Sequence, residues 1–246
     1  MKIFFFRLSF FGAAAAVALT FFLLTLPDVS RLRTATPSST AFIEQRRASL
    51  REAGRNDRID RIIVPLREIS LAMRRAVILT EDENFYLHNG VDWAATKLAL
   101  ETDLERGRIR IGGSTITQQL AKNLYLSPSR SPWRKLREMA IASKIESVLT
   151  KNRILELYLN SIEWGARTYG VEAAARRYFG HSAATLTLHE SATLAAMIAS
   201  PRLFDPQRHP RRLERRTARI LLLLKRVQIP GVPSQDFSRE KGRSAI

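Results

Sequence analysis

The sequence predicts a mainly α-helical protein, with one folded domain behind an apolar N-terminal helix. Most of the chain has apolar residues at the spacing of helices that bury one face. Strand signals are few and short, and the apolar fraction of 45% is normal for a packed core. A length of 246 residues favours a single domain with a short extension.

An apolar run at residues 8–26 is the predicted membrane anchor. It carries no charge, ends before Pro27, and would be about 28 Å long as a helix, enough to cross the hydrocarbon core of a bilayer. Lys2 and Arg7 lie before it and predict that residues 1–7 stay in the cytoplasm. A cleaved signal peptide is the alternative, but it would have a shorter apolar region and a small-residue cleavage site, which this run lacks.

The net charge of +17 predicts a polyanionic partner. Nucleic acid, an anionic membrane surface and a phosphorylated substrate are all compatible with it. A basic domain exported on a membrane anchor meets lipid headgroups rather than nucleic acid, so we expect a membrane and no nucleic acid among the partners. The absence of cysteine excludes disulfides, cysteine metal sites and cysteine nucleophiles.

Behind the anchor, residues 27–58 are expected to form a juxtamembrane linker. Its first part, to about residue 40, is rich in Ser, Thr, Pro and Arg, and its second part is charged and helical in pattern. Residues 59–226 should form the folded domain, and residues 227–246 a loosely ordered tail.

Within the domain, residues 62–66 are a short β-prone run, and Ser70 is placed to cap a helix over residues 71–79. Nine basic residues occupy the stretch 202–226, which leads into an apolar run. Further helices are predicted at 91–108, 134–149, 153–159, 171–179 and 188–200.

Glu81 is the candidate catalytic carboxylate. It stands beside Asp82 and Glu83 and just before Phe85 and Tyr86. Burial beside aromatic rings and repulsion by nearby carboxylates both raise a carboxyl pKa, which suits a general base near pH 7. The alternative is a solvated acidic turn, which this spacing alone does not exclude.

A second polar cluster follows a double glycine at residues 112–113. Hydroxyls, amides and a single cation on one face of a predicted helix suit an oxygen-rich, negatively charged ligand. Ser114 could cap this helix, or the amides of the turn could receive an anion. The side chains that recur at i, i+3, i+4 and i+7 are Thr115, Gln118, Gln119 and Lys122.

Two further groups carry charge that a phosphorylated ligand would need. Lys122 and Arg130 could hold a pyrophosphate, Lys as a point charge and Arg as a bidentate fork, or they could be ordinary surface cations. Glu138 has a similar alternative, a helical i,i+4 pair with Arg134 worth roughly a few tenths of a kcal/mol. The four histidines are scattered without metal-ligand spacing, so no metal site is predicted.

Five motifs, in order, resemble those of the peptidoglycan glycosyltransferases, over about residues 63–224. The first two are Glu81-Asp82-x-x-Phe85-x-x-His88-x-Gly90 and Gly112-Gly113-Ser114-Thr115-Ile116-Thr117-Gln118-Gln119-Leu120-x-Lys122-Asn123. The others are Arg134-Lys135-x-x-Glu138, Lys151-x-x-Ile154-Leu155-Glu156-x-Tyr158-Leu159-Asn160, and Gly170-x-x-x-Ala174-Ala175 with Tyr178-Phe179-Gly180. Five ordered motifs are far more specific than one, and the short chain is similar to the monofunctional members.

The resemblance implies a mainly α, lysozyme-like glycosyltransferase lobe with a smaller membrane-associated lobe. It implies polymerisation of lipid II into linear glycan strands, with the growing lipid-linked chain as donor and the 4-hydroxyl of lipid II as acceptor. The configuration at C1 inverts and undecaprenyl diphosphate leaves. With no transpeptidase motifs and no room for a second domain, cross-linking is not expected.

The same resemblance implies roles for individual residues. Glu81 is the general base, and Glu138 assists near the pyrophosphate. Lys122 and Arg130 stabilise the leaving pyrophosphate. No cofactor is required, although Mg²⁺ or Mn²⁺ could stimulate the reaction through Glu138. The remaining substrate-binding positions are Asp82, Phe85, Ser114, Thr115, Gln118, Gln119, Asn123, Arg134 and Lys135.

The implied partners are lipid II, the nascent lipid-linked glycan and the membrane, with cell-wall synthesis or division proteins as further candidates. The implied location is the bacterial inner membrane, with a single span, a cytoplasmic N-terminus and a periplasmic catalytic domain.

Two hypotheses come from other classes. A lytic enzyme on the related fold would need one catalytic Glu, but not the second and third motifs. A basic membrane-tethered scaffold or nucleic-acid binder would explain the charge, but it gives no reason for the polar helix face. Salt-sensitive DNA binding that survives Glu81→Gln would favour the binder, and donor-dependent polymerisation that this substitution abolishes would reject it.

Overall fold

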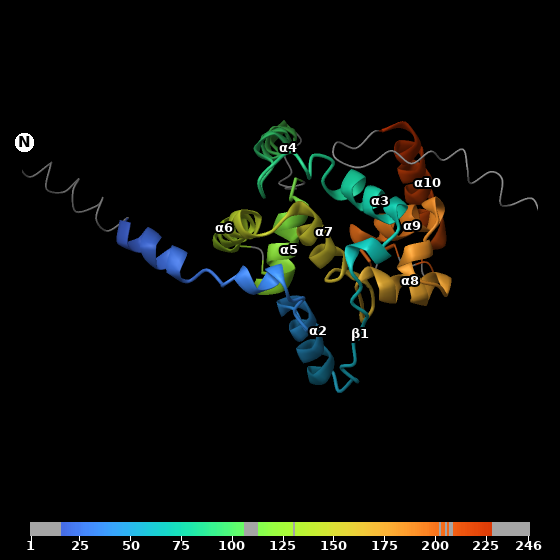
Figure 1. Cartoon of the computed structure of the whole chain (residues 1–246), viewed down its shortest axis with the longest axis horizontal. Helices are drawn as coiled ribbons and strands as arrows, with labels where there is room; N and C mark the ends of the chain where they lie inside the picture. Colours follow the sequence, from blue (N-terminus) through green and yellow to red (C-terminus); the bar gives the residue numbers. More distant parts are fainter. Residues whose placement is uncertain are drawn as a thin grey trace, which may run out of the picture.

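The computed structural model describes residues 16–105, 113–129, 131–201, 203–204, 206 and 209–227. Over these residues the chain is mainly helical, as the sequence predicts (Figure 1). The main helices are α2 (Ala41–Glu52), α3 (Leu71–Glu81), α4 (Trp93–Glu105), α5 (Ile116–Tyr125), α6 (Pro132–Val148), α7 (Lys151–Leu159), α8 (Val171–Phe179), α9 (Leu188–Ile198) and α10 (Pro210–Arg226). Short 3₁₀ turns lie at η1 (Ser30–Arg33), η2 (Leu66–Glu68) and η3 (Ala183–Thr185).

Two groups of packed helices meet in the middle of the molecule. In one group α5 lies against α2, α6 and α7, and in the other α9 lies against α3 and α10. One apolar core runs through both groups and includes Phe85, Ile116, Tyr158 and Trp164. The C-terminal end of α3 and the N-terminal end of α5 come together where the groups meet, and this junction holds the candidate site (Figure 1).

A three-stranded sheet lies beside α8. Its strands, in spatial order, are β1 (Asp60–Arg61), β3 (Thr168–Tyr169) and β2 (Glu163–Gly165). β1 pairs parallel with β3, and β3 pairs antiparallel with β2. The β-prone run at 62–66 does not form a strand, because the amide and carbonyl of Val64 bond to the side chain of Asn160 instead of a neighbouring strand. Pro65, which follows, has no N–H to donate.

The predicted anchor at 8–26 lies partly outside the described residues, which begin at residue 16. Residues 16–24 are helical, and the apolar side chains of Val17, Phe21 and Leu24 are largely exposed. In the described part of the chain, no helix combines the length and the apolar character needed to cross a membrane. A membrane span at 8–26 therefore stays a prediction.

The expected linker at 27–58 packs against the domain. Leu32 is buried in the main core, and Nε of Arg153 donates to its carbonyl at 2.8 Å. α2 follows, and its N-cap Thr40 accepts from the amide of Ile43, which is also buried. The sequence pattern predicted the helix in the second part of this stretch. It did not predict that the Ser- and Pro-rich first part packs against the domain, because composition does not specify tertiary contacts.

The basic C-terminal stretch forms α10 with one apolar face. Leu213, Thr217, Ile220 and Leu224 are buried at helical spacing, and most of the basic side chains face outward. The buried face packs against α9 and α3. The tail predicted at 227–246 lies, apart from its first residue, outside the described residues.

Candidate active site

α3 carries Glu81 as its last residue. The helix begins after Ser70, whose Oγ accepts from the amide of Met73 at 3.1 Å, as the sequence predicts. Val77 and Ile78 are fully buried. Glu81 lies one turn beyond them on the same face, so its carboxylate points toward the protein interior and is only half-exposed.

One amide and one phenol hold this carboxylate in place. Nε2 of Gln119 donates to Oε2 of Glu81 at 2.9 Å, and the hydroxyl of Tyr158 donates to Oε1 of Gln119 at 2.9 Å. Tyr158 is fully buried, and burial raises the pKa of its hydroxyl well above the ordinary value, so it stays a donor. Among the described residues no hydrogen bond reaches Oε1 of Glu81, which leaves this oxygen open to a substrate.

Burial raises the pKa of Glu81. The hydrogen bond from Gln119 and the positive charges of Arg216 and Lys122 oppose this rise, and the negative charge of Asp82 adds to it. Glu81 therefore binds a proton more strongly than an ordinary glutamate, as a general base near neutral pH requires. The direction agrees with the sequence prediction, but desolvation contributes more than repulsion by the neighbouring carboxylate.

Asp82 is buried and ties the end of α3 to the start of α5. Its two oxygens lie 2.9 and 3.0 Å from Nε2 of His88, and one of them accepts from the amide of Ile116 at 2.9 Å. Nδ1 of His88 accepts from the amide of Gly90, so Nε2 is the nitrogen that donates to Asp82. Gly90 has a φ of +91°, and a Cβ there would lie 3.1 Å from the carbonyl oxygen of Ala142, so this turn requires glycine.

A capping box starts α5. Oγ1 of Thr115 accepts from the amide of Gln118 at 3.1 Å, and Oε1 of Gln118 accepts from the amide of Thr115 at 3.0 Å. Both side chains are buried, whereas Gln119 and Lys122 are half-buried. The predicted polar face is therefore divided: its first two members stabilise the helix start, and the last two border the site. The prediction of a cap at Ser114 is wrong by one residue.

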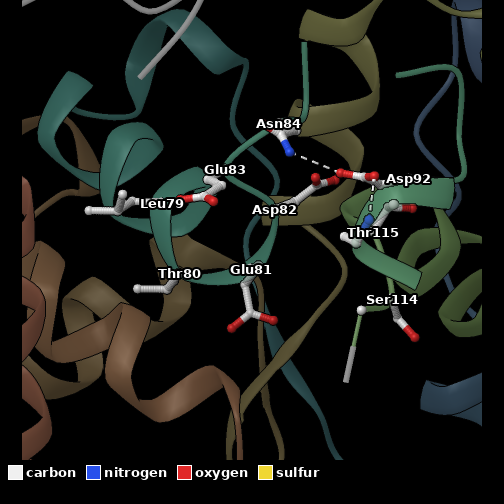
Figure 2. A pocket seen from close by; sticks show the side chains of 11 residues that line it. Leu79, Thr80, Glu81, Asp82, Glu83, Asn84, Asp92, Ser114 and Thr115 are labelled. Atoms are coloured by element: carbon white, nitrogen blue, oxygen red, sulfur yellow. Dashed lines mark hydrogen bonds between the residues drawn. The ribbon is translucent and has the colours of Figure 1, made fainter. Parts of the chain in front are cut away.

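A cavity of about 240 Å³ opens beside Glu81 (Figure 2). In this view the carboxylate of Glu81 and the hydroxyl of Ser114 point the same way, below the pair formed by Asn84 and Asp92. Nδ2 of Asn84 donates to Oδ2 of Asp92 at 3.0 Å and closes one side of the cavity. The lining residues are Leu79, Thr80, Glu81, Asp82, Glu83, Asn84, Asp92, Ala95, Gly113, Ser114 and Thr115.

A basic cluster lies beyond Ser114. Nζ of Lys135 donates to Oγ of Ser114 at 3.0 Å and to Oε1 of Glu138 at 2.6 Å. Arg134 donates to the other oxygen of Glu138, which is buried. The helical pair that the sequence offered as the alternative for Glu138 is therefore present, but it belongs to a larger network that reaches the turn before α5.

Lys122 faces this cluster from α5. Burial lowers the pKa of its ammonium group, and Arg134 and Lys135 lower it further, whereas Glu138 and Glu81 raise it. No ion pair within the described part of the chain includes Lys122 or Glu81. A half-buried cation without a fixed anionic partner is available to a negatively charged ligand.

The other predicted site residues differ in whether they reach the cavity. Phe85 is fully buried in the core, so its ring packs under the loop after α3 and does not line the cavity. Asn123 is half-buried on α5, and Arg130 lies outside the described residues. The alternative of a solvated acidic turn holds for Glu83, which is exposed, but not for the buried Asp82.

The sequence alone indicated no site role for Tyr158, Asn84 or Asp92. A signal for Tyr158 was present, because a phenol on the apolar face of a helix brings a hydroxyl that needs a partner once it is buried. Asn84 and Asp92 bond across an eight-residue loop, which no periodic pattern reveals.

Comparison with known proteins relates the chain to one family and to several close relatives. The sequence model of a family described as Transglycosylase matches residues 47–225. A protein of Nitrosospira multiformis named biosynthetic peptidoglycan transglycosylase is 45% identical over 194 residues, which cover 79% of this chain and 84% of that protein. A Bordetella pertussis protein of the same name is 47% identical over 198 residues, covering 79% and 82%. One from Chromobacterium violaceum is 41% identical over 219 residues, covering 89% and 96%.

Proposed function

The chain belongs to the transglycosylase family and is a peptidoglycan glycosyltransferase of cell-wall biosynthesis, and from this premise we propose that it polymerises lipid II into linear glycan strands. The donor is the growing lipid-linked chain, and the acceptor is the 4-hydroxyl of lipid II. The new glycosidic bond forms at C1 of the donor with inversion, and undecaprenyl diphosphate leaves. Cross-linking of stem peptides is not part of this activity.

One observation carries the proposal: Glu81 and Lys122 are half-buried at the same junction, and neither is part of an ion pair among the described residues. Glu81 would take the proton of the acceptor hydroxyl as its oxygen attacks C1. The bond from C1 to the pyrophosphate oxygen would break, and its electron pair would stay on that oxygen. Lys122 would stabilise the negative charge that develops there.

The basic cluster on α6 supports the same assignment. Lys135 and Arg134 lie on the Ser114 side of the cavity and face the same region as Lys122. Together they present three cations against the single buried carboxylate of Glu138. Such a local excess of positive charge suits the pyrophosphate of the donor. Arg130 belongs to the proposal through its charge and the family resemblance alone, since it lies outside the described residues.

A divalent cation at Glu138 does not fit the residues present. Both oxygens of this carboxylate already accept from a cationic side chain, Lys135 or Arg134. Nowhere in the described ranges do three or more His, Asp or Glu side chains come close enough to hold a metal ion. We propose instead that Glu138 positions Lys135 against Ser114, that the reaction requires no cofactor, and that any stimulation by Mg²⁺ or Mn²⁺ acts away from Glu138.

The membrane assignments also belong to the proposal. Residues 8–26 would anchor the chain in the bacterial inner membrane, with the catalytic domain on the periplasmic side. In Figure 1 α4 stands at the edge of the molecule, and Trp93 on α4 and Trp133 on α6 are 66% and 58% exposed. Exposed tryptophans suit the interface of a bilayer, where the lipid chains of donor and acceptor remain. Proteins of cell-wall synthesis or division are the candidate partners.

The test is polymerisation of lipid II in detergent by wild type, Glu81→Gln and Lys122→Met. We expect polymer from the wild type and a loss of about 100-fold or more in each variant. The exposed controls Glu52→Gln and Lys225→Met remove the same charges elsewhere and should keep wild-type activity. Full activity in Glu81→Gln would contradict the base role. No polymer from a folded wild type in several detergents would contradict the proposed function itself.

A further inference from the structure

The segment before the domain is clamped to it by two arginines. Arg153 donates from Nε to the carbonyl of Leu32 at 2.8 Å and from Nη2 to Oγ1 of Thr36 at 3.1 Å. Arg61 donates from Nη1 to the carbonyl of Pro37 at 2.9 Å. These bonds fix the backbone just before α2, so the first turn of that helix has a defined position.

α2 places an aromatic ring against the candidate pyrophosphate site. The first turn of α2 is anchored by Ile43, which is fully buried, and the helix packs on α5. The ring centroid of Phe42 lies 5.8 Å from Nζ of Lys122, within the range of a cation–π contact. Phe42 precedes residues 47–225, which the family model matches, and lies in the stretch that the sequence assigned to the linker.

The ammonium group of Lys122 has competing partners. Glu81 and Glu138 attract it, whereas Arg134 and Lys135 repel it. Its side chain is long and flexible, so a direct ion pair with Glu81 is within its chemistry. Such a pair would favour the charged carboxylate and weaken it as a base. It would also occupy the cation that must meet the pyrophosphate.

We propose that Phe42 is a positioning residue, whose ring face holds the ammonium group of Lys122 apart from Glu81 and available to the pyrophosphate. An aromatic ring attracts a cation without carrying a charge, so it holds the amine without competing with an anionic substrate. On the other side of the junction, Gln119 holds Glu81 by its hydrogen bond. The inference rests on the proposed roles of Glu81 and Lys122.

The first experiment compares Phe42→Leu with Phe42→Tyr. Leucine keeps an apolar side chain, and tyrosine keeps the ring. We expect Phe42→Tyr to stay near wild type and Phe42→Leu to lose about tenfold in kcat for lipid II polymerisation. In Phe42→Leu the acid limb of the pH profile of kcat should move to lower pH, because Lys122 pairs with Glu81 and lowers its pKa.

The shift of this limb reports on Lys122, since the substitution leaves the other charged and titratable groups unchanged. In the described ranges, those that face Glu81 are Asp82, Lys122, Tyr158 and Arg216, and those that face Lys122 are Glu81, Arg134, Lys135 and Glu138.

A packing control separates this role from general support of α2. Leu50 is buried at the other end of the same helix, and Leu50→Ala loosens α2 without touching Lys122. We expect Leu50→Ala to lower Tm and leave the acid limb in place. If Phe42→Leu behaves like Leu50→Ala, or if it keeps wild-type kcat and an unshifted acid limb, the positioning role is overturned.

A binding cycle tests the inference apart from turnover. Farnesyl pyrophosphate is a short probe for the leaving group, and its Kd can be measured by calorimetry for wild type, Phe42→Leu, Lys122→Met and the double variant. We expect Phe42→Leu to weaken binding several-fold, but to have no further effect once Lys122 is replaced. Additive losses, or no binding to wild type, would overturn the inference. A wild type that binds the probe but makes no polymer would instead contradict the proposed function.

Discussion

Glu81 makes the folded state sensitive to pH, because burial raises its pKa above that of the unfolded chain. Below the ordinary pKa of glutamate, about 4.3, the carboxyl group is protonated in both states. As the pH rises from there toward the raised pKa, the unfolded chain loses its proton first, and the free energy of unfolding falls. The carboxylate that we propose as the catalytic base thus reduces the stability of the fold near neutral pH.

Replacing the charge should recover that stability. We expect Glu81→Gln to raise Tm relative to wild type at pH 8 and to leave it unchanged at pH 4, while polymerisation is lost. Thermal unfolding at the two pH values measures this, with the exposed Glu52→Gln as a control without effect. A lower Tm for Glu81→Gln at pH 8 would show that the carboxylate stabilises the fold.

Gln119 should lower the pKa of Glu81, whereas burial raises it. Its hydrogen bond favours the charged form of Glu81, so Gln119→Leu should raise the pKa of Glu81 further and move the acid limb of the kcat profile to higher pH. Tyr158 would lose its acceptor, which costs about 1–3 kcal/mol of stability for a buried hydroxyl.

Tyr158→Phe is the matched variant for this prediction. It leaves the bond between Gln119 and Glu81 in place but frees the amide to rotate, so its shift should have the same direction and a smaller size. A shift to lower pH in Gln119→Leu would contradict this assignment.

At the scale of elements, two helices begin with the same device and only one of them borders the site. Thr115 and Gln118 form a capping box at α5, and Thr187 and Glu190 form one at α9. In α5, Oγ1 of Thr115 also donates to the carbonyl of Gly90 at 2.6 Å. The cap of α5 therefore also fixes the loop that follows Glu81.

The two caps form a matched pair of substitutions. Thr115→Ala and Thr187→Ala should each destabilise the protein by about 1 kcal/mol, measured by denaturant unfolding. Only Thr115→Ala should also lower kcat, because it releases the loop at Gly90 and the turn that carries Ser114. Equal losses of activity in both variants would mean that the effect comes from stability alone.

The elements show which parts of the fold the sequence could predict. The sequence predicted α3 from the Ser70 cap and α8 from the apolar spacing at residues 171–179. Both signals are properties of short stretches and need no tertiary information. The division of the polar face of α5 was out of reach. The helical period places Gln118 and Gln119 on neighbouring positions of the same face, so it does not distinguish them. Gln119 is the one that borders the site because its side chain bonds to Glu81 at the end of α3.

At the scale of the whole molecule, the stretch that composition assigned to a linker is part of the folded unit. Leu32 lies in the core, and the arginines of the clamp, Arg153 and Arg61, come from α7 and β1. A stretch rich in Ser, Thr and Pro has the composition of a linker whether or not its backbone is bound by the rest of the fold. Its docking could therefore not be predicted without the tertiary structure.

Two truncations test this arrangement. Deletion of residues 1–15 should keep Tm, because it leaves in place every contact that residues 22–40 make with the domain. Deletion of residues 1–40 removes buried Leu32 and the Thr40 cap of α2, so Tm should fall by about 10 °C and polymerisation in detergent should decrease. Equal Tm values for the two truncated proteins would show that the segment contributes nothing to the fold.

The docked segment also constrains how far the cleft can move. The helix at 16–24 is held at its end, where Arg137 donates to the carbonyl of Thr25 at 3.0 Å and the rings of Phe22 and Trp133 lie 5.1 Å apart. A free tether would let a catalytic domain sweep through a wide volume above a bilayer. If residues 8–26 cross the membrane as proposed, these contacts would instead hold the catalytic cavity at one height and one tilt above the bilayer. Substrates would then be selected by the depth at which their pyrophosphate lies, before any contact with Glu81.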